Sequence, residues 1–137
     1  MKKLILLAVF LLTVAAPTWG HHAFAAEFDA TKPIKFTATV VKMDWINPHA
    51  WINVTVKDAA GNVTPWRIEA AAPNALLRRG WTKNSLLPGT EVNVEGYQAI
   101  DGSNRANGSV ITFTDGKKLF VGSSAGDPGA APGAPQR

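Results

Sequence analysis

The sequence predicts a small all-β domain with one short helix, and three observations support this fold class. Apolar and polar residues alternate with a period of two in several short segments, as in strands with one buried face. Turn signals rich in Gly, Pro, Asn and Asp separate these segments. The 137-residue chain has 46% hydrophobic and 18% charged residues, which suits one globular domain with a core. The chain has no cysteine, so this core must stabilise the domain without disulfides.

Residues 1–20 have the pattern of a cleavable signal peptide. Two lysines precede an apolar run over residues 4–16, which is too short for a membrane-spanning helix of about 20 residues. A cut after Gly20 leaves His21 as the first residue, whereas a cut after Ala25 removes this histidine and the next. The cut after Gly20 is favoured because it lies closer to the apolar run. We therefore expect an exported protein, periplasmic or secreted, with no membrane span after cleavage.

An arm over residues 21–32 precedes the predicted strands, which are rich in Val, Ile, Thr and Trp. The alternation slips at Val41, which predicts a bulge or sharp coiling in a long first strand. We expect strands over residues 34–45, 49–57, 63–71, 90–99 and 109–114, with a short closing strand over 118–121.

A two-turn helix is predicted over residues 73–80, with Pro at its start and Gly at its end. Leu76 and Leu77 are expected to plug one end of a barrel. Three strands, a helix and two strands resemble the OB-fold, a five-stranded Greek-key barrel with a helix between strands three and four. An immunoglobulin-like sandwich is the alternative, which the helix disfavours. The barrel is expected over residues 33–122, followed by a disordered Gly/Ala/Pro-rich tail over 123–137.

Charge and composition exclude several functions. The formal net charge of +4 includes two leader lysines, so the mature chain carries only +2 and has no basic stripe. We therefore expect no nucleic-acid partner. No nucleophile with a nearby base and no pair of acidic residues suggests catalysis. The sequence predicts a binding protein rather than an enzyme.

The three histidines suggest a metal site. If cleavage follows Gly20, His21 offers a free α-amine and its own imidazole to one metal ion. A further imidazole, from His22 or His49, would complete a three-nitrogen set that suits Cu(II). The alternative is that His21 and His22 are exposed arm residues that bind metal only adventitiously.

The expected pairing of two strands adds Glu69 to this set. A hairpin loop over residues 58–62 pairs Lys57 with Val63, so that Glu69 lies directly opposite Trp51 and diagonal to His49 on one outward face. Glu69 is then a weak ligand, or it orients the His49 imidazole. The same face holds Asn53 and Arg67, and the alternative is an ordinary Arg67–Glu69 surface pair.

A metal-independent ligand or partner face is the second hypothesis. Its residues are Trp51, Asn53, Arg67 and Asn47, and it would bind a small ligand or a periplasmic protein. Trp51 and Trp81 would supply a stacking surface for a sugar or peptide, as this face of an OB-fold often does. Trp66 is expected in the core.

Four segments resemble a family of small exported bacterial proteins that is known only as a domain of unknown function. They are His21-His22-Ala23-Phe24-Ala25-Ala26-Glu27-Phe28-Asp29, Asp44-Trp45-Ile46-Asn47-Pro48-His49-Ala50-Trp51, Trp66-Arg67-Ile68-Glu69, and Pro73-Asn74-Ala75-Leu76-Leu77-Arg78-Arg79-Gly80-Trp81. The resemblance covers about residues 20–121, and the tail is longer than the family pattern. It implies export with His-His at or near the mature terminus, which supports the cut after Gly20, and it implies no established activity.

Overall fold

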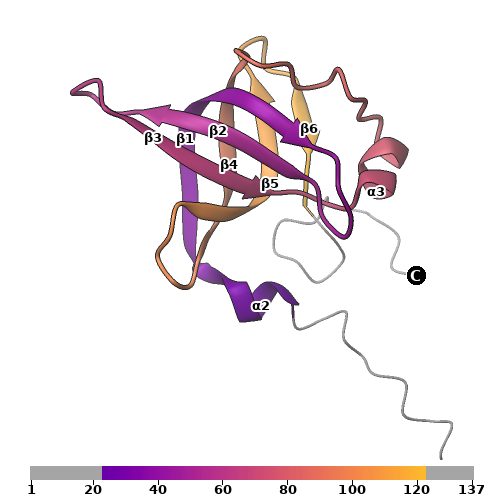
Figure 1. Cartoon of the computed structure of the whole chain (residues 1–137), viewed down its shortest axis with the longest axis horizontal. Helices are drawn as coiled ribbons and strands as arrows, with labels where there is room; N and C mark the ends of the chain where they lie inside the picture. The colour runs from indigo at the N-terminus through magenta and orange to yellow at the C-terminus, as the bar shows by residue number, and fades with distance from the viewer. Residues whose placement is uncertain (1–22, 123–137) are drawn as a thin grey trace, which may run out of the picture.

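The computed structural model describes residues 23–122, which form a predominantly β structure with two short helices (Figure 1). The signal peptide, His21, His22 and the tail lie outside the described residues. The elements in chain order are α2 (Ala23–Glu27), β1 (Phe28–Asp44), β2 (Trp51–Lys57), β3 (Val63–Glu69), α3 (Pro73–Arg78), β4 (Glu91–Ala99), β5 (Arg105–Phe113) and β6 (Lys118–Phe120). Neither helix of the described chain is long and apolar enough to span a bilayer.

The strands lie in the order β3-β2-β1-β4-β5-β6, and neighbours in this order are antiparallel. A parallel pairing also joins β3 to β5, where Arg67, Ile68 and Glu69 face Arg105, Ala106 and Asn107. The strand pairings therefore run from β1 through β2, β3, β5 and β4 back to β1. The predicted all-β class is confirmed.

The first strand is bulged as predicted but starts earlier. Its register with β2 shifts between Val40 and Lys42, which leaves Val41 as the extra, exposed residue. The strand begins at Phe28 rather than at residue 34, because Phe28 pairs with Ala99 of β4. Part of the predicted arm is therefore strand.

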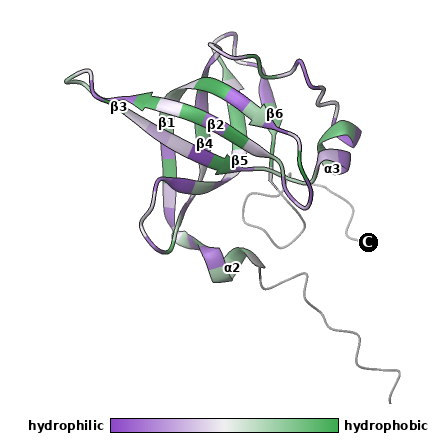
Figure 2. Cartoon of the chain, in the orientation of Figure 1, coloured by the Kyte–Doolittle hydropathy of each residue, from purple (hydrophilic) through white to green (hydrophobic). Residues whose placement is uncertain are grey.

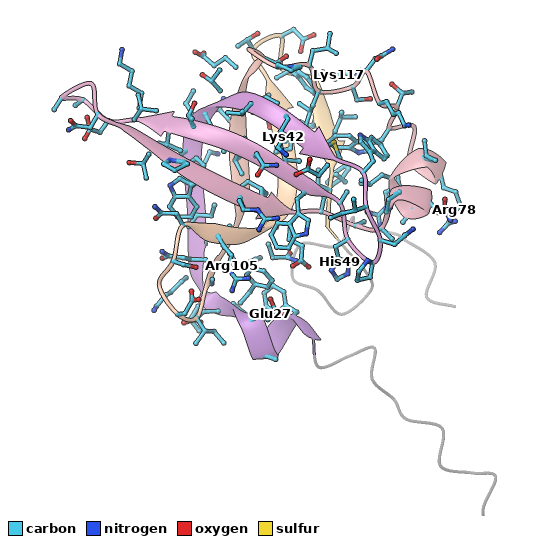
Figure 3. All side chains as sticks on the ribbon, viewed as in Figure 1. Glu27, Lys42, His49, Arg78, Arg105 and Lys117 are labelled. Carbon is cyan, nitrogen blue, oxygen red and sulfur yellow. The ribbon has the colours of Figure 1, made fainter. Side chains whose placement is uncertain are left out.

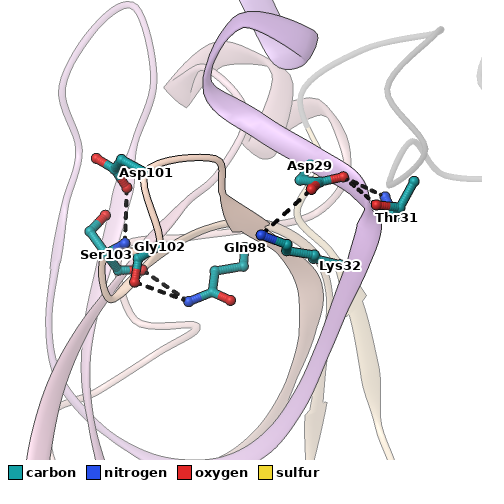
Figure 4. Close-up of polar contacts among 7 residues, drawn as sticks. All are labelled: Asp29, Thr31, Lys32, Gln98, Asp101, Gly102 and Ser103. Carbon is teal, nitrogen blue, oxygen red and sulfur yellow. Dashed lines mark hydrogen bonds and ion pairs between the residues drawn. The ribbon is translucent and has the colours of Figure 1, made fainter.

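The intervening residues 29–32 form a second irregularity, shown in Figure 4, in which the Asp29 carboxylate accepts hydrogen bonds from the backbone N–H and hydroxyl of Thr31. The same close-up shows the β4–β5 loop, where the Gln98 amide donates to the carbonyl oxygens of Gly102 and Ser103. Local polar contacts therefore satisfy the backbone where the strand ladders are interrupted.

The register of the β2–β3 hairpin is the predicted one. Lys57 pairs with Val63, Asn53 with Arg67 and Trp51 with Glu69. The hairpin projects beyond the other strands in Figure 1. Its loop is closed by Asp58, whose carboxylate accepts hydrogen bonds from the backbone and side-chain N–H groups of Asn62.

The core lies on the inward faces of the strands, and Figure 2 shows the alternation of hydrophobic and hydrophilic residues along them. Fully buried side chains include Ile52 and Val54 of β2, Ile68 of β3, Val92 and Val94 of β4 and Ile111 of β5. Trp66 is half-buried, with its ring 4.9 Å from that of Phe36.

Three expectations near the core and β5 were wrong. Leu76 of α3 is buried, but Leu77 is about half exposed, because adjacent side chains of a helix point in different directions and only one of the two faces the core. Trp81 is buried, and its indole N–H donates to the Phe120 carbonyl at 3.1 Å, so Trp81 offers no stacking surface. The fifth strand starts at Arg105 rather than at residue 109, because residues 105–107 pair with β3 as well as β4.

Candidate functional site

His49 is positioned by the corner between β1 and β2. The peptide bond between Asn47 and Pro48 is cis. After this bond, the backbone N–H of Ala50 donates to the Ala71 carbonyl at 3.2 Å, and the Ala50 carbonyl accepts from the Ala70 N–H at 2.9 Å. These two hydrogen bonds extend the β2–β3 pairing to the residue before β2. Because alternate residues point to one face, His49 projects on the same side of the sheet as Trp51.

His49 and Glu69 are in direct contact. The Nδ1 atom of His49 lies 2.9 Å from Oε1 of Glu69, which is hydrogen-bond distance. The cross-strand diagonal predicted from the hairpin register is therefore present in the structure. The contact assigns Nδ1–H as the donor to the carboxylate, and it leaves Nε2 as the ring nitrogen that can bind a metal or another ligand.

The two partners differ in exposure. The side chain of His49 is 32% exposed, whereas that of Glu69 is 8% exposed. Glu69 was expected on an open outward face; it does lie on that face, but it is covered, and the β5 strand beside it at Asn107 contributes to this. A hydrogen bond to a buried carboxylate forms in a lower dielectric than one at the surface, so it is stronger electrostatically.

Within residues 23–122 no three His, Cys, Asp or Glu side chains gather closely enough to hold a metal ion. The described part of the chain therefore contributes the candidate metal ligand His49 and its hydrogen-bond partner Glu69. His21 and His22, the other proposed ligands, precede the described residues.

Helix α2 marks where the chain enters the described structure. The Phe24 ring lies 5.7 Å from the Tyr97 ring of β4 and 5.8 Å from that of Phe28. The Glu27 carboxylate lies 3.6 Å from Arg105 of β5, and both residues are labelled in Figure 3 together with His49. Arg105 pairs with Arg67, two residues before Glu69. The described part of the chain therefore begins beside β5, which pairs with the strand that carries Glu69.

The proposed ligand face is largely occupied by contacts among its own residues. The Arg67 guanidinium carbon lies 4.5 Å from the centre of the Trp51 ring, a cation–π contact. The side-chain amide of Asn53 donates to Asp44 at 2.9 Å. Asn47 is exposed in the corner. Of the predicted face, Trp51, Asn53 and Arg67 lie together on adjacent strands.

Asp44 is a member of this face that the sequence did not indicate. Its carboxylate also accepts a hydrogen bond from Lys42 at 2.9 Å. The hydrogen bonds from Lys42 and Asn53 hold the pKa of the Asp44 carboxyl below its usual value. Extending the hairpin register across β1, where Asp44 pairs with Trp51, is the one step that would have found it.

Asn107 and Arg105 were missed for a different reason. Both neighbour the site only through the parallel β3–β5 pairing. Asn107 is 1% exposed, and its side-chain oxygen has no hydrogen-bond partner in the structure described for residues 23–122. A hollow lined by Pro33, Ile34, Lys35, Glu95, Gly96, Tyr97 and Ser109 lies on β1, β4 and β5 and includes neither His49 nor Glu69.

Comparison with known proteins gives a family and no activity. Neither a curated protein nor a solved structure matches the sequence. The family described as "Family of unknown function (DUF6152)" matches residues 8–108, which is well over half of the chain. The match agrees with the resemblance to a domain-of-unknown-function family noted in the sequence. The chain belongs to this family, DUF6152.

Proposed function

We propose that the mature protein binds a transition-metal ion, with Cu(II) as the best candidate, through His49 and the histidine at its amino terminus. The observation that carries the proposal is the 2.9 Å contact from His49 Nδ1 to the buried Glu69 carboxylate. Metal-binding histidines almost always donate their second ring N–H to a carboxylate, a carbonyl or water. Such a partner fixes the tautomer and makes the other nitrogen a better ligand.

The remaining ligands are proposed from the sequence. Cleavage after Gly20 would give His21 a free α-amine, so its amine and imidazole would provide two nitrogens and His49 Nε2 a third. His22 is the further imidazole candidate. Nitrogen ligands in a planar arrangement suit Cu(II), which also has the highest affinity among the divalent first-row metals. In this arrangement Glu69 orients His49 and does not bind the metal itself.

The position of α2 supports both the cleavage site and the approach of the terminus. A cut after Ala25 would remove Phe24, whose ring packs against Tyr97 and Phe28. A cut after Gly20 keeps this anchor. The Glu27–Arg105 contact holds the first described residues beside β5, which pairs with β3. These contacts support a cut that retains both terminal histidines, and the leader pattern of residues 1–20 supports export to the periplasm or the medium.

The finer fold we infer is an OB-like Greek-key barrel. Its support is the pairing sequence β1-β2-β3-β5-β4-β1 together with α3 between β3 and β4. In such a barrel the outward side of β2 and β3 is a frequent binding surface, and His49 and Glu69 lie on it. We propose binding rather than catalysis, because the sequence suggests no nucleophile with a nearby base.

A metal-independent module that binds a ligand or a protein partner is the second candidate. The exposed Arg67 guanidinium over the Trp51 ring favours it, because the pair presents a charged and aromatic surface. Binding of such a ligand would be unaffected by chelators and would be lost in Trp51→Ala. The engagement of Asn53 by Asp44 leaves this face fewer free polar groups, which is why the metal site is preferred.

A copper titration of exported protein tests the proposal. The protein is produced with its own leader, its first residue is established by intact mass, and Cu(II) is titrated against a chelator of known affinity. We expect a terminus at His21 and one tight site that His49→Ala weakens at least 100-fold. A terminus at residue 26, or equal affinity in His49→Ala, would contradict the metal proposal and turn attention to Trp51.

A further inference from the structure

Four side chains on adjacent strands form a continuous row beside the His49 site. Trp51 of β2 pairs with Glu69 of β3, Glu69 pairs with Asn107 of β5, and Asn107 pairs with Tyr97 of β4. Paired residues of neighbouring strands point to the same face of a sheet, about 5 Å apart. The row therefore places two polar side chains between two aromatic rings on the outward face.

The two central members of the row are buried. Counted over the whole residue, Glu69 is 6% exposed and Asn107 is 1% exposed. The side-chain oxygen of Asn107 is one of two buried side-chain atoms in residues 23–122 without a hydrogen-bond partner. Buried polar atoms are nearly always paired, because an unpaired one costs about 1–3 kcal/mol. The orphaned oxygen therefore points to a donor group that completes the site.

The neighbours of this oxygen define the chemistry of that donor. A carboxylate and an amide oxygen side by side accept hydrogen bonds, and a carboxylate favours a donor that carries positive charge. Trp and Tyr rings attract cations over their faces. Trp51 already holds one cation in this way, the Arg67 guanidinium at 4.5 Å. All four members of the row thus favour a cationic donor.

We propose that the Trp51–Glu69–Asn107–Tyr97 row is a binding site for a positively charged nitrogen group, an ammonium or a protonated imidazole. Asn107 accepts one of its N–H donors and Glu69 balances its charge. Two sources can supply this group: a free amine ligand, or the segment of the chain that precedes α2. The second source is considered because Phe24 of α2, near the first described residue, packs on Tyr97, the last member of the row.

This inference does not depend on the metal proposal. It uses the oxygen atoms of the row and not Nε2 of His49, and it is tested in the presence of EDTA. Loss of copper binding in His49→Ala would leave it intact, a terminus at residue 26 would leave the free amine as its one source, and its own failure would leave the copper titration unaffected.

The test uses the mature protein, uniformly labelled with ¹⁵N and ¹³C, and follows its NMR spectrum during titration with n-butylammonium chloride. Sodium butyrate, of similar size and opposite charge, is the matched ligand control. Asn107→Leu keeps the volume of the side chain and removes the acceptor. Thr112→Val is the matched variant control, because the Thr112 hydroxyl is the other buried atom without a partner and lies on the same strand.

Two results support the proposal and identify the source. A free amine is the source if n-butylammonium binds saturably and Asn107→Leu weakens it about tenfold or more, the effect expected for losing a hydrogen bond to a charged group. The chain itself is the source if n-butylammonium does not bind and the resonances of residues 21 and 22 shift in Asn107→Leu but not in Thr112→Val.

Three results would overturn it: butyrate binding as well as n-butylammonium, Thr112→Val reproducing the effect of Asn107→Leu, or neither a bound amine nor a shift at residues 21 and 22. If Asn107→Leu does not fold, Asn107→Asp replaces it. This variant keeps the shape and an oxygen acceptor and adds negative charge. Retained or tighter cation binding is then expected, and loss of binding would count against the site.

Discussion

At the scale of single residues, the His49–Glu69 contact is the feature from which the proposed function follows. The imidazole is partly exposed and the carboxylate is buried, so one end of the pair can meet a ligand while the other is held in place. The contact arises from sequence in a simple way. His49 continues the β2 alternation by one step beyond Trp51, and Trp51 pairs with Glu69.

Replacing Glu69 with Gln should therefore weaken copper binding about 10- to 100-fold, the usual effect of losing the partner of a metal-bound histidine. Glutamine keeps the shape of the side chain and removes its charge. Chelator competition measures the affinity. Glu95→Gln is the matched control, because Glu95 forms an outward-facing ion pair with Lys35 at 3.0 Å. Equal affinities in wild type and Glu69→Gln would show that Glu69 has no part in metal binding.

Asp44 predicts a pH dependence of stability. Its pKa in the folded protein is lowered, first by the Lys42 hydrogen bond and then by that of Asn53, relative to a value of about 3.9 in an unfolded chain. A carboxylate of this kind stabilises the fold above the unfolded pKa, and this stabilisation is lost as the pH falls through the folded pKa.

Asp44→Asn should accordingly lower the free energy of unfolding by up to about 1 kcal/mol near neutral pH, the range for exposed ion pairs. The difference from wild type should shrink as the pH falls below about 4. Urea denaturation at neutral and acidic pH measures both values. A difference that grows toward acidic pH would contradict the role assigned to Asp44.

At the scale of elements, β5 turns the outward face of β3 into a covered site. Gly96 of β4 allows this packing, because a Cβ atom at residue 96 would lie 2.1 Å from the backbone oxygen of Asn107. The register between β4 and β5 also shifts between Glu95 and Gly96. The bend expected at this glycine therefore serves a close approach of two backbones.

Gly96→Ala should destabilise the protein by about 2–3 kcal/mol, because a backbone atom cannot move aside as a flexible side chain can. Gly102→Ala is the comparison: a Cβ atom at residue 102 meets nothing within 4 Å, but the φ of +73° is strained for alanine and costs about 1 kcal/mol. Thermal and urea unfolding of both variants give the values. Equal losses would mean that β4 and β5 are not held this closely.

The sequence patterns correctly predicted those features of the fold that depend on local contacts. The β2–β3 register followed from the loop length, and the β1 bulge followed from the slip at Val41. The β3–β5 pairing could not be derived in this way, because its partners are almost forty residues apart and no turn fixes their register. The burial of Glu69 and the role proposed for Asn107 both depend on that pairing, so the sequence missed them.

At the scale of the whole molecule, the β3–β5 pairing ties the last long strand to the first hairpin. Ile68 lies at this junction, fully buried, and pairs with Ile52 on one side and Ala106 on the other. Strands distant in sequence therefore share one core, and we expect the domain to unfold as a single unit.

Ile68→Ala should lower the free energy of unfolding by about 2–5 kcal/mol, since it removes buried methyl groups and leaves a cavity. In each protein, far-UV and near-UV circular dichroism should report one common transition midpoint, and this midpoint should be lower in Ile68→Ala than in the wild type. Val63→Ala, at an exposed position of the same strand, is the control and should change stability little. Two separate transitions in the variant would show that the hairpin unfolds independently of the remaining strands.

The most direct test of the account is the electron paramagnetic resonance spectrum of the mature protein with one equivalent of Cu(II), compared with that of His49→Ala. The proposed copper site should give a spectrum with hyperfine coupling to at least three nitrogen ligands in the wild type, and one nitrogen should be lost from this pattern in the variant. The same nitrogen pattern in both proteins would show that His49 does not bind the metal, and it would contradict the central claim.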